Sequence, residues 1–145
     1  MTTKEAKEFL RSIRYEQMEL LHLQEMIEKA EMEMLPQAIR YDKDKVQVSP
    51  EEKFSKICAA IADYQDELGR EIVQLLKKQT RAAEMIMGLE DEKERTVMRL
   101  YYLTTDHGQP LTWGQVAIRM NYFESHVKRI HGNALVHLVT KDDTK

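Results

Sequence analysis

The serine, histidine and cysteine residues are the first candidates for chemistry, but their spacing argues against catalysis. Ser125 and His126 are adjacent, so on a helix their side chains diverge by about 100° and form no nucleophile–base pair. His126 and His131 are five residues apart, whereas metal ligands on one helical face need a spacing of three or four. Cys58 is the single cysteine, which excludes an internal disulfide and a cysteine-based zinc site. We therefore predict no enzyme activity, no cofactor and no bound metal.

A basic helical face offers a different kind of site. Two short helices are predicted from residue 112 to 120 and from residue 124 to about 139, joined by residues 121–123. In the second helix, Val127, Ile130, Ala134 and Leu138 recur at helical spacing and form an apolar face. The opposite face then presents Ser125, Lys128, Arg129, Gly132 and Val136. Two short helices with a tight link and a basic second helix are typical of a helix-turn-helix.

The side chains of this motif suit contacts with duplex DNA. Lys128 and Arg129 can bind phosphates or guanine edges, and Ser125 lies in the first turn, where base contacts usually begin. Gly132 allows close approach of the backbone or merely loosens the helix. The predicted DNA-binding residues are Ser125, His126, Lys128, Arg129, Gly132, Asn133, Thr112 and Gln115.

Local signals predict how the motif is held. Thr112 and Gln115 have the spacing of a capping box. Asn121 tolerates the left-handed conformation that a tight link needs. Trp113 is expected in the core rather than as a base-stacking platform, together with Val116, Ala117 and Met120. His131 lies near the apolar face and is expected to be a packed core residue.

A third helix is predicted before the motif, from Asp91 to Leu103. Gly88 separates it from the preceding segment, and Val97, Leu100 and Tyr101 are expected to point inward. Residues 106–110 contain Gly108 and Pro110 and are predicted to form a turn.

The N-terminal segment predicts two long helices. The first begins at a capping box of Thr2 and Glu5 and ends near Leu35, before Pro36. Its stripe contains Ala6, Leu10, Ile13, Leu20, Ile27 and Met34, with the polar residues Gln17, Gln24 and Glu31 on the same seam. This spacing resembles a coiled coil with polar interruptions.

Residues 36–48 are predicted to be a polar connection to the second long helix. That helix begins with Ser49 as its cap, Pro50 in its first position and Glu52 completing a capping box. Its expected stripe contains Phe54, Ile57, Ile61, Tyr64, Leu68, Ile72, Leu75, Ala82 and Ile86. Two long helices with a short link should form an antiparallel hairpin.

These patterns predict an all-α fold. Five glycines and three prolines are few for a β-rich chain. We predict a coiled-coil-like hairpin at residues 1–87 for oligomerisation or protein contact, and a three-helix DNA-binding module at residues 88–145. The hairpin has few layers, so it should pack on that module or on a second copy of itself. No apolar run reaches the roughly 18 residues of a membrane span, and no signal peptide is evident, so we expect a cytoplasmic protein.

Charge is unevenly distributed along the chain. Residues 95–145 contain seven Lys and Arg against four Asp and Glu, a balance of +3. Because the net charge of the chain is −3, the first 94 residues carry a charge of −6. Such an asymmetry suggests different partners for the two parts. The excess is too small to indicate nucleic-acid binding by itself.

Three segments resemble known regulators: Leu111–Ala117, Met120–Tyr122 and Val127–Leu135. They are similar to the helix-turn-helix of sigma-factor region 4, and more closely to the ArpU/RinA-type late-gene transcription regulators of phages in Gram-positive hosts. Arg95–Leu103 resembles the same group, so the similarity covers about the last 50 residues. In that group Ser or Thr usually caps the second helix where Phe123 stands here. Phe cannot accept the capping hydrogen bond, so the cap must come from elsewhere or be absent.

The resemblance implies a phage-encoded DNA-binding regulator acting at late promoters in the bacterial host cytoplasm. Its implied partners are double-stranded DNA and host RNA polymerase, with a homodimer formed through the N-terminal helices. The alternative is a small terminase subunit for DNA packaging, which also joins a helix-turn-helix to helical oligomerisation segments. The polar seam at Gln17, Gln24 and Glu31 argues against the strongly apolar core that a multi-subunit ring would need.

Overall fold

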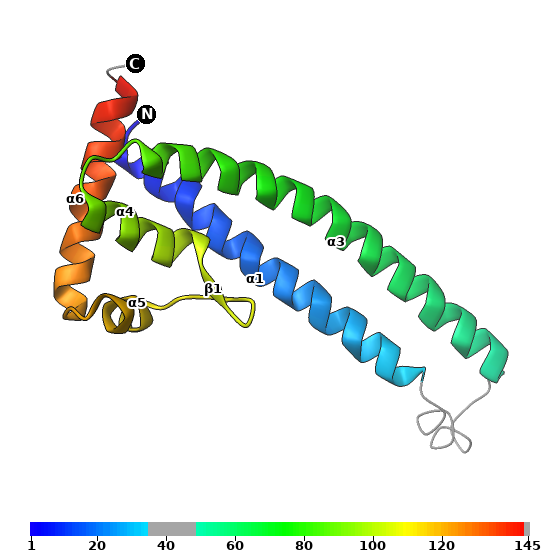
Figure 1. The fold of residues 1–145 in the computed structure, drawn as a ribbon. Helices are drawn as coiled ribbons and strands as arrows, with labels where there is room; N and C mark the ends of the chain where they lie inside the picture. Colours follow the sequence, from blue (N-terminus) through cyan, green and yellow to red (C-terminus); the bar gives the residue numbers. More distant parts are fainter. Residues whose placement is uncertain (35–48, 144–145) are drawn as a thin grey trace. The chain divides into compact units, whose positions relative to one another are not determined.

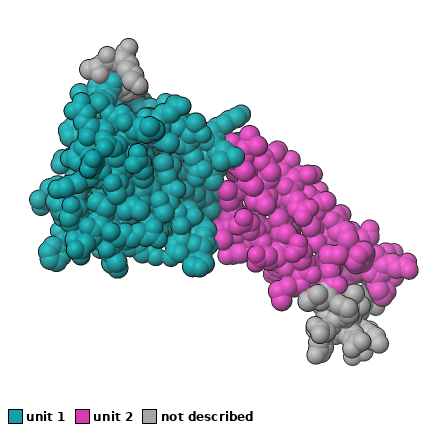
Figure 2. Space-filling model, in the orientation of Figure 1, with its two compact units in different colours: residues 1–18, 74–145 teal, residues 19–73 magenta. Residues whose placement is uncertain are grey.

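The computed structural model describes residues 1–34 and 49–143, and these residues are predominantly helical, which confirms the all-α fold (Figure 1). They divide into two compact units, one formed by residues 1–18 and 74–145 and the other by residues 19–73 (Figure 2). No helix within the described ranges is long and apolar enough to cross a membrane. The connection predicted at residues 36–48 lies outside the described residues.

Helix α1 (Thr3–Glu33) begins as predicted. The Glu5 N–H donates to Thr2 Oγ1 at 3.1 Å, and the Thr2 N–H donates to Glu5 Oε2 at 2.7 Å. This hydrogen bond from the Thr2 backbone lowers the pKa of Glu5. Ala6, Leu10 and Ile13 are buried as expected.

The predicted polar seam of α1 is wrong beyond its first position. Gln17 and Ile27 are buried as predicted, but Gln24 and Glu31 are exposed, and Leu23, which the pattern left out, is buried. The reason is geometric, since a straight α-helix has 3.6 residues per turn and drifts away from a strict seven-residue repeat. The inward stripe therefore passes through Leu23 rather than Gln24.

Helix α3 (Pro50–Met87) also begins at its predicted cap, where the Glu52 N–H donates to Ser49 Oγ at 3.2 Å. Leu75, Ala82 and Ile86 are buried. The stripe was wrong at two positions, because Phe54 is 49% exposed and Ile72 is 38% exposed. α1 and α3 pack together as an antiparallel pair (Figure 1).

The third predicted helix is present but does not remain α-helical to its end. α4 (Glu92–Met98) is capped by Asp91, whose carboxylate accepts a hydrogen bond from the Lys93 N–H at 2.8 Å. A π-helical turn, η1 (Arg99–Leu103), continues it. Val97 is buried and Leu100 and Tyr101 are half-buried, as predicted.

The predicted turn at residues 106–110 is a minimal β-hairpin. β1 (Thr105–Asp106) pairs antiparallel with β2 (Gln109–Pro110), in a register that places Thr105 opposite Pro110. His107 and Gly108 connect the strands with φ values of 52° and 82°. Positive φ at both central residues matches the twist of a two-residue hairpin loop. The all-α prediction thus missed one local strand pair.

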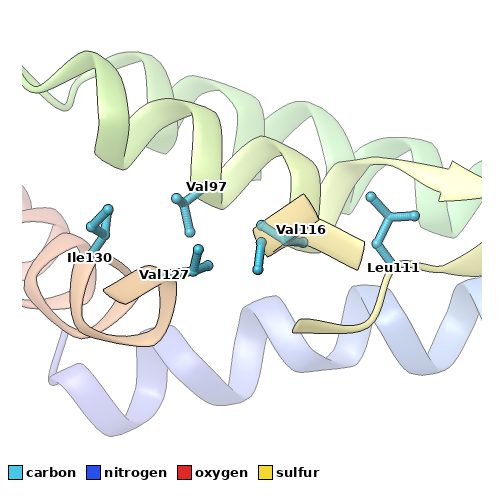
Figure 3. Close-up of a cluster of buried hydrophobic side chains, with 6 residues drawn as sticks. Val97, Leu111, Val116, Val127 and Ile130 are labelled. Atoms are coloured by element: carbon cyan, nitrogen blue, oxygen red, sulfur yellow. The ribbon is translucent and has the colours of Figure 1, made fainter. Parts of the chain in front are cut away.

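The last two helices are α5 (Trp113–Met120) and α6 (Glu124–Asp143), the latter a turn longer than predicted. Together with α4 they enclose a core, in which Val97 and Val127 face each other (Figure 3). This core consists of Val97, Leu111, Val116, Ala117, Val127 and Ile130. It fixes the angle between α5 and α6, on which a helix-turn-helix depends.

Candidate nucleic-acid interface

The link between α5 and α6 is determined by local hydrogen bonds. At the start of α5, Thr112 and Gln115 form the predicted capping box: the Gln115 N–H donates to Thr112 Oγ1 at 3.2 Å, and the Thr112 N–H donates to Gln115 Oε1 at 2.8 Å. At its end, Asn121 adopts the predicted left-handed conformation, with φ 59° and ψ 43°. The Tyr122 N–H closes the turn onto the Ala117 carbonyl at 3.0 Å. The chain therefore reverses within three residues and starts α6 at Glu124.

α6 begins directly after Phe123, a residue that has no side-chain oxygen to cap the helix. Phe123 contributes its carbonyl, which accepts hydrogen bonds from the N–H groups of His126 and Val127, both at 3.1 Å. Its side chain is 85% exposed and takes no part in capping. Glu124 lies in the first turn, where its negative charge interacts favourably with the helix dipole.

The outward face of α6 carries most of the predicted DNA-binding residues. Ser125, Lys128, Arg129, Gly132 and Asn133 are all exposed there. Lys128 Nζ lies 3.1 Å from a carboxylate oxygen of Glu124, one helical turn earlier. This exposed pair is worth little to stability, so the ammonium group can exchange its partner for a phosphate at small cost.

The remaining predicted residues are less available for contact with DNA, because their side chains are already packed or hydrogen-bonded. His126 is half-buried, with its ring packed edge-on against Tyr122 at 4.8 Å between centroids. Thr112 and Gln115 are exposed, but each already uses an oxygen atom in the capping box. The Gln115 amide nitrogen keeps its donors, so this end of α5 can still bind an anion.

An aromatic cluster anchors the inner face of α6. His131 is 7% exposed, and its Nε2 shares a 2.6 Å hydrogen bond with the buried Tyr102 hydroxyl. Burial lowers the pKa of His131 to about 4, assisted by the positive charges of Lys7 and Arg11. Trp113 stacks on Tyr101 with centroids 3.7 Å apart. His131 is therefore a packed core residue, as predicted, and Trp113 is half-buried and packs against the core rather than inside it.

Two polar side chains of α1 bind the module in a way that sequence reasoning missed. Arg14 Nη1 donates to the carbonyls of Tyr101 and Leu111 at 2.6 and 2.7 Å, and its guanidinium lies 3.8 Å above the Tyr101 ring. Gln17 Nε2 donates to the Tyr102 carbonyl at 3.2 Å. These carbonyls lie in and after η1, where the π-helical turn and the hairpin leave them without a regular helical donor. The sequence signal was Gln17, a polar residue in the apolar stripe of the first helix, whereas Arg14 lay outside that stripe.

A second polar contact connects α4 with α6. The buried Glu94 carboxylate lies 2.8 and 2.9 Å from His137 Nδ1. One turn further along α6, Lys141 lies 3.5 Å from Glu90. These groups line a cavity of about 290 Å³ together with Leu89, Asp91 and Thr140. Across residues 1–34 and 49–143 no cluster of three metal-ligating side chains occurs.

The comparison with protein families agrees with this geometry. The model of sigma-70, region 4, matches residues 91–138, which include α4, α5 and most of α6 and amount to about a third of the chain. This segment is therefore a helix-turn-helix domain like sigma-70 region 4, a class of DNA-binding domain. No curated protein and no solved structure matches the chain.

Proposed function

We propose that this protein is a non-enzymatic transcription regulator that binds double-stranded DNA through α5 and α6. The observation that carries the proposal is the exposed row of Ser125, Lys128 and Arg129 on the second helix of a region 4-like domain. In a helix-turn-helix this helix enters the major groove, while the first helix crosses the phosphate backbone. The buried inner face of α6 keeps that helix in position.

Each exposed group has a role in this proposal. Lys128 and Arg129 bind phosphates or guanine edges, and Ser125 and Asn133 offer hydrogen bonds to base edges. Gly132 lets the backbone approach the groove closely, and the His126 ring lies beside the helix start. Thr112 and Gln115 mark the N-terminus of α5, where free N–H groups and the helix dipole favour a phosphate.

The finer proposal is a phage-encoded activator of late genes, as the ArpU/RinA-type resemblance implies. Residues 88–145 would read a promoter element, and residues 1–87 would form a homodimer or contact host RNA polymerase. The negative charge of the first 94 residues supports a division of tasks, because an acidic surface is repelled by DNA and remains available to protein partners.

One feature favours the alternative of a small terminase subunit. The long α1 and α3 pair leaves Met32 66% exposed and Phe54 49% exposed. Apolar side chains of this size on long helices could serve assembly into a ring by head-to-tail contacts. Light scattering of the purified protein separates the two functions: a monomer or dimer supports the regulator, and a ring of eight or more copies supports the terminase subunit.

DNA binding is tested by measuring affinity for random duplex fragments by fluorescence anisotropy at several salt concentrations. Binding should weaken steeply with salt, and neutralising Lys128 and Arg129 to Gln should lower the slope of log K against log salt by about 2, because each phosphate contact contributes about 0.9. The double variant Lys128→Glu, Arg129→Glu should abolish binding. Its matched control is Lys56→Glu, Lys77→Glu, which changes the net charge equally at exposed positions of α3. The proposal fails if the wild-type protein binds no duplex at low salt. It also fails if the charge reversals on α6 and on α3 weaken DNA binding equally.

A further inference from the structure

We propose that Phe123 reads a thymine, by packing its ring against the 5-methyl group of that base in the major groove. The inference rests on the DNA binding proposed above and adds a specificity residue to it.

The position of Phe123 is the first argument. It immediately precedes α6, and its carbonyl accepts the first hydrogen bonds of that helix from the N–H groups of His126 and Val127. The residues at the N-terminal end of a recognition helix are those that reach base edges. A side chain at this point, directed away from the core, therefore extends toward the floor of the groove.

Its exposure is the second argument. At 85%, Phe123 is more exposed than any other large apolar side chain in the described part of the chain. The ring neither caps α6 nor packs in the core of the module. Because the ring contributes little to the stability of the fold, it is available for a contact with a partner.

The surroundings of the ring are the third argument. Phe123, Asn121, Tyr122 and His126 line a cavity of about 360 Å³. The Tyr122 and His126 rings pack edge to face and form a firm wall of that cavity. A methyl group carried by a flat base fits against such an aromatic surface.

The charges around Phe123 indicate which kind of partner it meets. Glu124 directly follows Phe123 and pairs with Lys128 at 3.1 Å, and Arg129 is exposed beside Lys128 on the next turn of α6. Both cations suit phosphates at the groove edges. Among the groups that the bases present in the major groove, the 5-methyl of thymine is the large apolar one. An apolar side chain at the start of a helix that also presents Lys128 and Arg129 therefore matches a groove with a thymine in its floor better than it matches an apolar protein surface.

The test first selects duplexes from a randomised library with the full-length protein. Each thymine of the selected duplex is then replaced, one at a time, by deoxyuridine, which removes only the 5-methyl group. At one position wild-type affinity should fall about fourfold, the equivalent of exposing one buried methyl group. Phe123→Ala should lose a similar factor on the thymine duplex and be insensitive to deoxyuridine at that position. Phe123→Leu should keep part of the sensitivity.

Met87→Ala is the matched control, because Met87 is 69% exposed on α3 and its loss should leave the thymine effect unchanged. The inference is overturned if no deoxyuridine position affects the wild-type protein, or if Phe123→Ala weakens both duplexes and remains sensitive to deoxyuridine. The second pattern would assign Phe123 to the sugar–phosphate backbone. If the library yields no bound duplex at all, the proposed DNA binding fails as well. If duplexes are bound through Lys128 and Arg129 without a thymine effect, only the inference fails.

Discussion

His131 should make the stability of the helix-turn-helix unit depend on pH. Its ring is 7% exposed and shares a 2.6 Å hydrogen bond with the Tyr102 hydroxyl. Burial and the nearby charges of Lys7 and Arg11 lower its pKa from 6.5 to about 4. Between these two values the unfolded chain binds a proton that the folded chain does not bind. The stability contribution is therefore complete above pH 6.5 and is lost as the pH falls toward 4.

The size of the effect follows from the two pKa values. With 6.5 for the unfolded and about 4 for the folded state, lowering the pH from 7 to 5 removes about 2 kcal/mol of unfolding free energy through this group. A residual loss of about 1 kcal/mol follows below pH 5. Protonation does not break the bond to Tyr102, because the imidazolium can donate to the phenol oxygen. The cost comes from burying a positive charge beside Lys7 and Arg11.

Urea unfolding at pH 7, 6 and 5 would measure this loss, with the fluorescence of Trp113 as the signal. Trp113 is the single tryptophan and its ring lies 4.7 Å from that of His131, so it reports on this unit. The control is His131→Gln, which cannot titrate and retains a polar group for Tyr102. Since the other histidines are present in both proteins, the stability difference between them should change by about 2 kcal/mol from pH 7 to pH 5. Parallel pH curves would refute the argument.

Two further variants test the contacts that position α5 and α6. Arg14→Met removes the donors to the Tyr101 and Leu111 carbonyls. It should lower the unfolding free energy in urea by about 2 to 3 kcal/mol, because it leaves two acceptors unsatisfied. The control Lys4→Met, at an exposed position of the same helix, should lower it little, and equal losses would contradict the role of Arg14. Asn121→Ala should lower stability by about 1 kcal/mol in thermal unfolding, since alanine fits poorly at φ 59°. Asn121→Gly should not lower it. An alanine variant as stable as the wild-type protein would count against strain at this turn.

Local chemistry explains why much of the helix-turn-helix could be predicted. The capping box of Thr112 and Gln115 and the left-handed Asn121 depend on residues within one or two turns, and all were present as expected. The apolar face of α6 followed from helical spacing alone, and Val127 and Ile130 are indeed buried. These signals act over a few residues, so a single sequence contains them.

Long-range contacts explain what was missed. Tyr102 is almost completely buried, yet the sequence pattern favoured Tyr101, because a π-helical turn rotates the face that points inward. The exposed Gln24 shows the same limit, since the inward stripe depends on the true helical period and on what packs beside it. Arg14 appeared as one of many charged surface residues. Only the fold brings it to carbonyls 87 and 97 positions further along the chain.

The compact unit that contains the DNA-binding module also includes the first 18 residues. Arg14 and Gln17 supply donors to the carbonyls of Tyr101, Tyr102 and Leu111 at the junction between η1 and α5. Without α1 these carbonyls would lose their partners, and each unsatisfied acceptor costs about 1 to 3 kcal/mol where water cannot reach it. A change in α1, for example on dimerisation or on contact with another protein, would therefore alter the hydrogen bonds that these carbonyls accept before α5. This connection ties α1 to the segment that leads into α5.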